Sequence, residues 1–257
     1  MTRTTSPRVD LRGVVLPLAL LALWWTLTAN AWVDTRLIVP PGRVLHVAAT
    51  TLADPLFWHG VLASLGRDVS GFAVGALCGV ALGCLLGASH TAERLLGPSF
   101  HALRQISLFA WLPLLSSWLG YGEIAKLVFI ALSTLYPVAL GTVDGVRGVA
   151  REWGEVARVF RFTRTQWLFR LILPAAAPQI ATGLTLGLVS AWVATIGSEF
   201  LLANWGNGLG NIIIKGRAAF NIELIVVGML AVGVVGTLLN RIAARVEARV
   251  LRWQPAR

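Results

Sequence analysis

Few side chains in this sequence have the types and spacing that covalent chemistry on a substrate would need. No nucleophile is paired with a base in a recognisable pattern, and the four histidines lack the spacing of metal ligands. Neither lysine, Lys126 or Lys215, is followed by Ser or Thr, so a GxxxxGK[ST] phosphate-binding loop is absent. The sequence therefore predicts no metal site and no ATPase site of this type, and it disfavours an enzyme.

Other polar residues lie within apolar stretches, where they could line a path for a solute. Glu199 is an acidic residue in such a stretch, and ionisable groups at membrane depth usually face an interior or an aqueous cavity. We consider it either a gate or pathway residue, or a carboxylate at the interface, close to external water. Because a bare carboxylate is a poor ligand for an anionic solute, we expect Glu199 to pair with a nearby arginine such as Arg67. Ser117, Thr134 and Ser190 could line the same path or hydrogen-bond to their own helix backbone.

The composition explains why these polar residues stand out. The chain has 257 residues, of which 56% are hydrophobic and 13% are charged, as in an integral membrane protein. The net charge of +10 could indicate a nucleic-acid partner, but the arginines alternate with apolar segments of about 20 residues. We therefore predict a membrane protein without a nucleic-acid partner.

The apolar segments predict an all-α transmembrane domain with six spans that covers residues 1–257. The approximate spans are 14–32, 69–89, 101–119, 124–143, 175–202 and 222–243. Pro113 and Pro137 predict kinks in the third and fourth spans. Residues 44–65 form an amphipathic pattern, which predicts a surface-lying helix.

The arginines predict the orientation of these spans. Sixteen of the 22 basic residues lie in segments that are cytoplasmic if both termini are inside, and the remaining six lie in external segments. Because cytoplasmic loops are rich in Lys and Arg, both termini are expected in the cytoplasm.

The second predicted span has a glycine at every fourth position from Gly71 to Gly87. On a helix these glycines form one slowly turning stripe, which allows another backbone to approach closely. We expect static helix packing along this stripe, with a sliding surface as the alternative.

The longest polar interruption, residues 146–174, contains six arginines and is called the central loop below. Trp153, Val156, Ala157 and Phe160 have the spacing of one face of a short helix. Thr163 and Gln166 then fit a capping box, which predicts the start of a second short helix.

The central loop also contains a spaced pattern: Glu155-Val156-Ala157, then Arg161, then Leu171-Ile172-Leu173-Pro174. It resembles the pattern EAA, three residues, Gly, nine residues, I-x-L-P of the permease subunits of bacterial ABC importers. In this chain Val156, Arg161 and Leu171 depart from that pattern. The stretches Ala110–Leu127, Leu173–Leu188 and Gly197–Ile213 extend the resemblance to the nitrate, sulfonate, taurine and bicarbonate permease group.

This resemblance implies a type I (MetI-like) importer permease fold in the inner membrane. It also implies that two permease copies, expected as a homodimer, pair with two cytoplasmic ATP-binding subunits that hold Mg-ATP, while this chain has no cofactor. An external binding protein would deliver a small solute, such as a sulfonate or nitrate. An ion-coupled secondary transporter is the alternative, although the sequence has neither paired intramembrane carboxylates nor an internal repeat.

By the same resemblance, Trp153–Phe160 would be the coupling helix that an ATP-binding subunit grips. The residues expected to couple the ATPase are Trp153, Glu155, Val156, Ala157, Phe160, Arg161, Leu173 and Pro174. Arg161 replaces the glycine that would permit a left-handed turn at the end of this helix, and an arginine there costs roughly 1 kcal/mol. We therefore expect a reshaped turn, or a helix that continues past Arg161.

Overall fold

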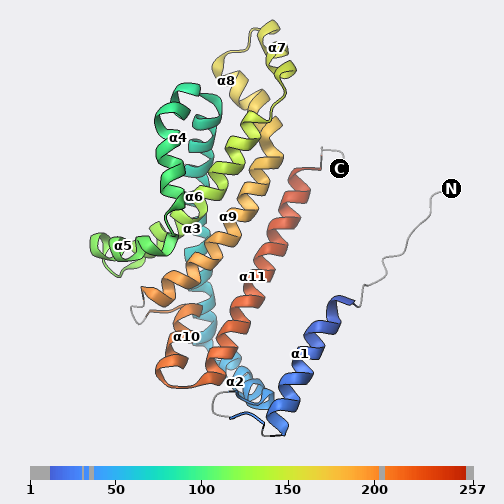
Figure 1. Cartoon of the computed structure of the whole chain (residues 1–257), viewed down its shortest axis with the longest axis vertical. Coiled ribbons are helices and arrows are strands. Elements are labelled where there is room, and N and C mark those ends of the chain that lie inside the picture. The colour runs from blue at the N-terminus through green and yellow to red at the C-terminus, as the bar shows by residue number, and fades with distance from the viewer. Residues whose placement is uncertain (1–11, 31, 35–37, 203–205, 253–257) are drawn as a thin grey trace, which may run out of the picture.

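The structure is a computed structural model that describes residues 12–30, 32–34, 38–202 and 206–252. Throughout these residues the regular secondary structure is helical, as predicted. The α-helices are α1 (Arg12–Ala29), α2 (Pro41–Ala53), α3 (Pro55–Ala88), α4 (His90–Gln105), α5 (Leu112–Leu119), α6 (Glu123–Arg147), α7 (Arg151–Val159), α8 (Arg164–Gln166), α9 (Leu173–Leu201), α10 (Leu209–Ala218) and α11 (Ile222–Val250). Figure 1 shows α7 and α8 at one end of a bundle of long helices and α2 and α10 at the other. These are called the α7 end and the α10 end below.

Four of the described helical segments are long and apolar enough to cross a membrane. They are α3, α6, α11 and a continuous helix, Trp167–Leu201, which contains α9. The predicted first span corresponds to α1, whose apolar part, Val15–Ala29, is shorter. The predicted spans 14–32, 69–89, 124–143, 175–202 and 222–243 thus all lie on helices, although the helix bounds differ.

The third predicted span, 101–119, is wrong as a continuous helix. α4 ends at Gln105, the backbone is extended at Ile106 and Ser107, and a 3-10 turn (Leu108–Trp111) leads into α5. Pro113 lies in the first turn of α5, where its missing N–H is not needed, so it starts a helix and does not kink one. α6, by contrast, continues through Pro137.

The surface-lying helix predicted for residues 44–65 is also divided. α2 ends at Ala53, and the Asp54 side chain accepts a hydrogen bond from the Leu56 amide at 2.9 Å. Asp54 therefore caps α3, and Pro55 occupies its first turn, where proline is favourable. The second half of the predicted segment thus belongs to the long helix α3.

The centre of the bundle is α6, which packs against α3 on one side and α9 on the other. The glycine stripe of α3 faces α6. A Cβ atom added at Gly75 would lie 2.4 Å from the carbonyl oxygen of Ala131, and one at Gly83 would lie 2.5 Å from Thr142 Cβ. The predicted close packing along the stripe is confirmed.

α1 runs beside the bundle and meets it near α2 (Figure 1). Trp24 packs with a cluster that contains Val39, Val44 and Val227, and its indole N–H donates to the carbonyl of Val39 at 3.0 Å. Most described side chains nearer the start of α1 are exposed, among them Leu16 at 67%. In this single chain α1 is therefore anchored at its C-terminal end.

Candidate functional site

The first candidate site is α7, the helix predicted to couple to an ATPase. Trp153 is 58% exposed and Phe160 is 70% exposed, whereas Ala157 is 4% exposed. Glu155 is also exposed, and the side chain of Val156 lies outside the described residues. The predicted apolar face therefore divides: its small residue is buried and its two aromatic residues point outward, available to a partner.

The turn that follows α7 contradicts the expectation for Arg161. Arg161 has φ 49°, and the Phe162 amide donates to the carbonyl of Ala157 at 3.0 Å, which closes a Schellman motif. The chain turns sharply in the left-handed conformation at Arg161. The turn is therefore not reshaped, and the helix does not continue past this residue. The hydrogen bond from Phe162 to Ala157 offsets part of the cost of the positive φ at Arg161, and the turn leads directly into the capping box of α8.

The capping box at the start of α8 is confirmed. The Thr163 amide donates to Gln166 Oε1 at 3.0 Å, and the Gln166 amide donates to Thr163 Oγ1 at 3.3 Å. The predicted second short helix, however, is not separate, because α8 continues through a π-helical segment (Trp167–Ile172) into α9. Leu173 and Pro174 thus lie inside one long helix.

Pro174 explains why the helix is π-helical in this segment. Proline has no amide hydrogen, and its ring would clash with the carbonyl of Arg170 in a regular α-helix. Here the Leu173 amide donates to the carbonyl of Leu168, five residues earlier, so the wider turn carries the helix past the proline. Ile172 is 3% exposed and packs with Val146, which fastens this segment to the bundle.

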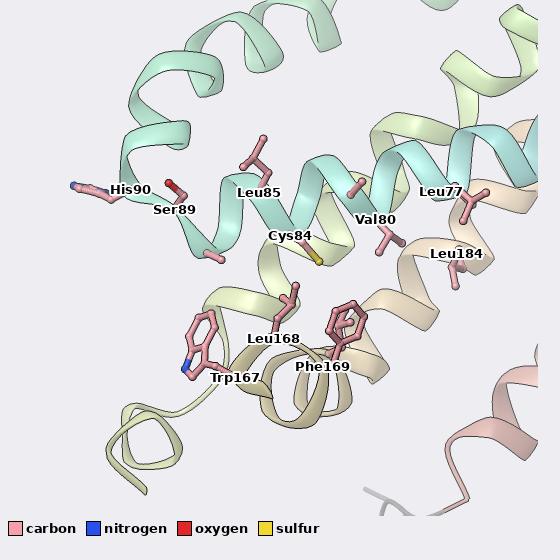
Figure 2. A pocket seen from close by; sticks show the side chains of 14 residues that line it. Leu77, Val80, Cys84, Leu85, Ser89, His90, Trp167, Leu168, Phe169 and Leu184 are labelled. Atoms are coloured by element: carbon pink, nitrogen blue, oxygen red, sulfur yellow. The ribbon is translucent and has the colours of Figure 1, made fainter. Parts of the chain in front are cut away.

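Two hollows border the π-helical segment. A cavity of about 480 Å³ lies between α7 and the ends of α3 and α6, with Glu155 and Trp167 in its lining. A larger groove of about 1100 Å³ separates α3 from the start of α9. Figure 2 shows Leu168 and Phe169 on one side of this groove and Cys84 on the other. α7 therefore borders open space, whereas α6 is packed tightly against both α3 and α9.

The second candidate site surrounds Glu199 at the far end of α9. Its side chain is fully buried, with 0% exposure. Arg67 Nη1 donates to Glu199 Oε1 at 2.7 Å, Ser64 Oγ donates to the same oxygen at 2.7 Å, and the Gly210 amide donates to Oε2 at 2.9 Å. The predicted pairing of Glu199 with Arg67 is confirmed.

Glu199 also caps the N-terminus of α10. The Leu209 amide donates to Ser64 Oγ at 2.9 Å, so Ser64 and Glu199 together satisfy two free amides of the first turn of α10. A Cβ atom at Gly208 would lie 2.5 Å from the Glu199 carboxylate carbon, so this approach requires glycine. Full burial contradicts a carboxylate in contact with external water. Complete hydrogen bonding indicates that Glu199 positions its neighbours, and its assignment to a gate or pathway stays a prediction.

Two more charged residues extend this network toward the surface. Arg67 donates from Nε and Nη2 to the two carboxylate oxygens of Glu123, the latter at 3.0 Å, and from Nη1 to the carbonyl of Asn207 at 2.7 Å. Lys126 Nζ donates to Glu123 Oε1 at 3.1 Å, although its side chain is only 2% exposed. Arg67 therefore joins α3, α6, α9 and the segment before α10.

The uncharged pathway candidates are not gathered into one site. Ser117 Oγ donates to the carbonyl of Pro113 at 2.8 Å, and Thr134 Oγ1 donates to the carbonyl of Ile130 at 3.0 Å. Thr134 is fully buried between α3 and α9, beside Gly75 and Gly187. Ser190 contributes its backbone carbonyl, which accepts a hydrogen bond from Ser133 at 2.9 Å. Their assignment to a pathway stays a prediction.

The sequence reasoning missed Ser64, Asp68, Glu123 and Lys126 as members of a polar cluster. Asp68 is fully buried and accepts a hydrogen bond from Thr195 Oγ1 at 3.1 Å, one helical turn from the Ser64–Glu199 contact. A signal was available, since Ser64 and Asp68 are four residues apart and Glu123 and Lys126 are three apart, which places each pair on one helix face.

Comparison with known proteins shows the family of this chain. A family described as "Binding-protein-dependent transport system inner membrane component" matches residues 71–252, which is more than half of the chain. The chain belongs to this family. It is a multi-pass inner membrane permease subunit of an ABC importer, as the resemblance implied.

Named relatives agree over almost the whole chain. The permease is 31% identical to the nitrate import permease protein of Synechocystis sp., over 96% of this chain and 90% of that protein. It is 32% identical to the bicarbonate transport system permease protein of Synechococcus elongatus, over 95% and 92%. It is 28% identical to the taurine transport system permease protein of Escherichia coli, over 91% and 86%.

The solved structures support the fold. The permease superposes on the MetNI methionine ABC transporter in an inward-facing conformation with a TM-score of 0.65 at 20% identity, over 76% of this chain and 96% of that chain. It superposes on an amino acid ABC transporter crystallised with histidines with a TM-score of 0.63 at 18% identity, over 78% and 97%. The fold is that of ABC importer permeases, as predicted.

Proposed function

We propose that two copies of this permease form a homodimeric pathway, and that one ATP-binding subunit docks on the α7 helix of each copy. The observation that carries this proposal is the outward exposure of Trp153 on α7 and of Phe160 directly after it, at 58% and 70%. Exposed aromatic side chains beside a charged residue are typical anchors for a protein partner. Glu155 on the same helix supplies that charge.

In this proposal Trp153 and Phe160 fill a groove of the ATP-binding subunit, and Glu155 pairs with a lysine or arginine there. The left-handed turn at Arg161 fixes the direction in which α7 meets the rest of the loop. Mg-ATP is bound by the partner, and this chain contributes no cofactor ligand. The energy of ATP hydrolysis therefore enters the permease as movement of α7.

The continuous helix Trp167–Leu201 offers a route for that movement. Its first turns border the cavity beneath α7, and its last turn carries Glu199. A continuous helix transmits rotation and translation along its length, whereas a flexible linker would absorb them. Leu173 and Pro174 lie within this helix and would move with it.

The proposed orientation places the α7 end in the cytoplasm and the α10 end outside. The central loop has six arginines, and the last turns of α11 carry Arg241, Arg245 and Arg249. Arg3 and Arg8, which predict a cytoplasmic N-terminus, lie outside the described residues. An external solute-binding protein would then meet the α10 end.

We propose a small anion as the solute. The named relatives import or transport nitrate, bicarbonate and taurine, and each of these carries an oxyanion group. The positions of Arg67 and Lys126 near the proposed external end agree with an anionic solute, since fixed cations attract anions toward a pathway.

The test is to purify the permease with an ATP-binding subunit and a solute-binding protein encoded beside it, and to reconstitute the complex into vesicles. We expect a stable complex and solute uptake that requires both ATP and the binding protein. Uptake without ATP that follows an ion gradient would contradict the proposal and favour a secondary transporter.

A further inference from the structure

We propose that Arg67 and Lys126 form a binding site for a small oxyanion, and that the carboxylate of Glu123 occupies this site in the present structure. The proposal rests on the proposed function for the class of solute. It concerns a site that the transported anion, or an anion of the same chemistry, would enter by displacing Glu123.

The contacts of Glu123 are those that an oxyanion would make. The Arg67 guanidinium donates from Nε and Nη2 to the two carboxylate oxygens, and Lys126 Nζ donates to Oε1 at 3.1 Å. Paired parallel hydrogen bonds from arginine suit any planar group with two adjacent oxygens. Nitrate and bicarbonate have this geometry, and a sulfonate presents a similar pair of oxygens.

The exposures show which partner can leave. The side chains of Arg67 and Lys126 are 11% and 2% exposed, whereas that of Glu123 is 56% exposed. Arg67 is also held from behind by Glu199 and by the carbonyl of Asn207, each at 2.7 Å. The cations are therefore fixed in the protein, and the carboxylate lies on the solvent side of them.

Glu123 can move without disturbing a helix. It is the first residue of α6 and follows the turn at Gly120–Gly122, where Gly120 has φ 71°. A rotation of its side chain into water leaves the backbone of α6 in place. Amides of the first turn of α6 also carry partial positive charge, which favours an anion at this position.

The charges favour exchange of one anion for another. Glu199 balances one of the two cations, and within the part of the chain that the structure describes Glu123 is the carboxylate that pairs with Lys126. A buried ammonium without a counterion is costly, so Glu123 can leave only when another anion arrives. Competition with Glu123 keeps solute binding weak enough for release, which a transport site requires.

The alternative is a fixed brace, in which Glu123 only ties α3 to α6. The two interpretations differ once the carboxylate is removed. A brace leaves a defect that anions relieve only through general ionic strength. A masked site leaves a gap with two fixed cations, which a small oxyanion fills in a saturable way.

The experiment uses the purified transporter complex in lipid nanodiscs with Glu123→Ala. Thermal unfolding is followed while nitrate or methanesulfonate is added, with the wild type titrated in parallel to report ionic strength. We expect the variant to unfold at a lower temperature than the wild type. Its Tm should then rise by roughly 2–4 °C in a saturable manner, since a ligand stabilises the state that it binds.

The controls test the role of Lys126 and the position of the site. Lys126→Gln added to Glu123→Ala should abolish the anion-dependent rise. Glu93→Ala removes a carboxylate that pairs with Arg147 at 2.7 Å at the other end of the bundle, where Arg147 is 44% exposed, and should show no saturable rise. If Glu123→Ala does not fold, Glu123→Gln removes the charge with little change of shape and is titrated in the same way.

An equal rise in the wild type and in Glu123→Ala, or a rise that survives Lys126→Gln, would overturn the masked site. That result would leave ATP-dependent uptake by the wild type unaffected. Conversely, a saturable rise in Glu123→Ala without ATP-dependent uptake would retain the anion site and reject the proposed function.

Discussion

Two carboxylates of this permease, Glu155 and Glu199, differ in environment, and we propose a different role for each. Glu155 is exposed on α7, where its charge is available to a partner. Glu199 is fully buried and accepts hydrogen bonds from Ser64, Arg67 and Gly210. From this difference in exposure we propose Glu155 as a docking residue and Glu199 as a positioning residue.

The docking role predicts the effect of reversing one charge. Glu155→Lys should weaken association with the ATP-binding subunit by roughly 10- to 100-fold, because like charges would then meet across the interface. Titration of the detergent-solubilised permease with that subunit measures the change. Membrane insertion and thermal stability should stay at wild-type values, since the side chain is exposed.

Glu152→Lys is the matched control, because Glu152 is exposed on the same short helix. It should retain most of the affinity. Equal losses in both variants would indicate a general charge effect and contradict a specific contact at Glu155.

At the scale of elements, the packing of α3 against α6 depends on the absence of side chains. Gly75 and Gly83 bring the two backbones together, and α6 is held on its other side by α9, where Gly141 approaches Gly183. This packing gives the bundle a rigid centre. Movement is then expected where packing is looser, around α7 and the cavity beneath it.

Gly75→Ala tests that rigidity. The added methyl group would lie 2.4 Å from the carbonyl oxygen of Ala131, so we expect a loss of roughly 1–3 kcal/mol of stability. Gly66→Ala is the control on the same helix, where an added Cβ meets nothing within 4 Å. It should raise stability by roughly 0.5–1 kcal/mol, since alanine favours a helix. Thermal unfolding in nanodiscs compares the two, and similar effects would contradict the packing role of the stripe.

The elements also show what the sequence could predict. Long apolar runs predicted the long helices, and the spacing of Thr163 and Gln166 predicted the capping box, because these signals are local. The prediction of the third span was wrong because a proline such as Pro113 can either kink a helix or begin one. Which of the two occurs depends on the packing of neighbouring helices. The prediction for Arg161 was wrong for a similar reason. The capped helices on both sides hold this residue in a left-handed conformation, although that conformation is unfavourable for arginine.

The polar network at Glu199 was predicted only in part. The pairing with Arg67 followed from the rule that buried charges need partners. Ser64, Glu123 and Lys126 come from two other helices, and their convergence depends on how α3, α6 and α9 pack. The spacing within each helix places each pair on one face, but it does not predict that the faces of different helices meet.

At the scale of the whole molecule, the permease has two distinct ends, and several long helices run between them. The α7 end presents aromatic side chains and carries the basic central loop, and the α10 end holds the buried ion network. The helix Trp167–Leu201 connects them, with the π-helical segment at its start. Such a division suits a transporter in which one partner supplies energy and another delivers solute on opposite sides of the membrane.

Docking of the ATP-binding subunit on α7 can be tested directly by photo-crosslinking. A photoreactive phenylalanine analogue replaces Trp153 in one variant and Trp118 of α5, an equally available residue at 68% exposure, in another. After illumination of the assembled complex, we expect the Trp153 variant to crosslink to the ATP-binding subunit and the Trp118 variant not to crosslink to it. Crosslinking of that subunit from Trp118 and not from Trp153 would contradict it.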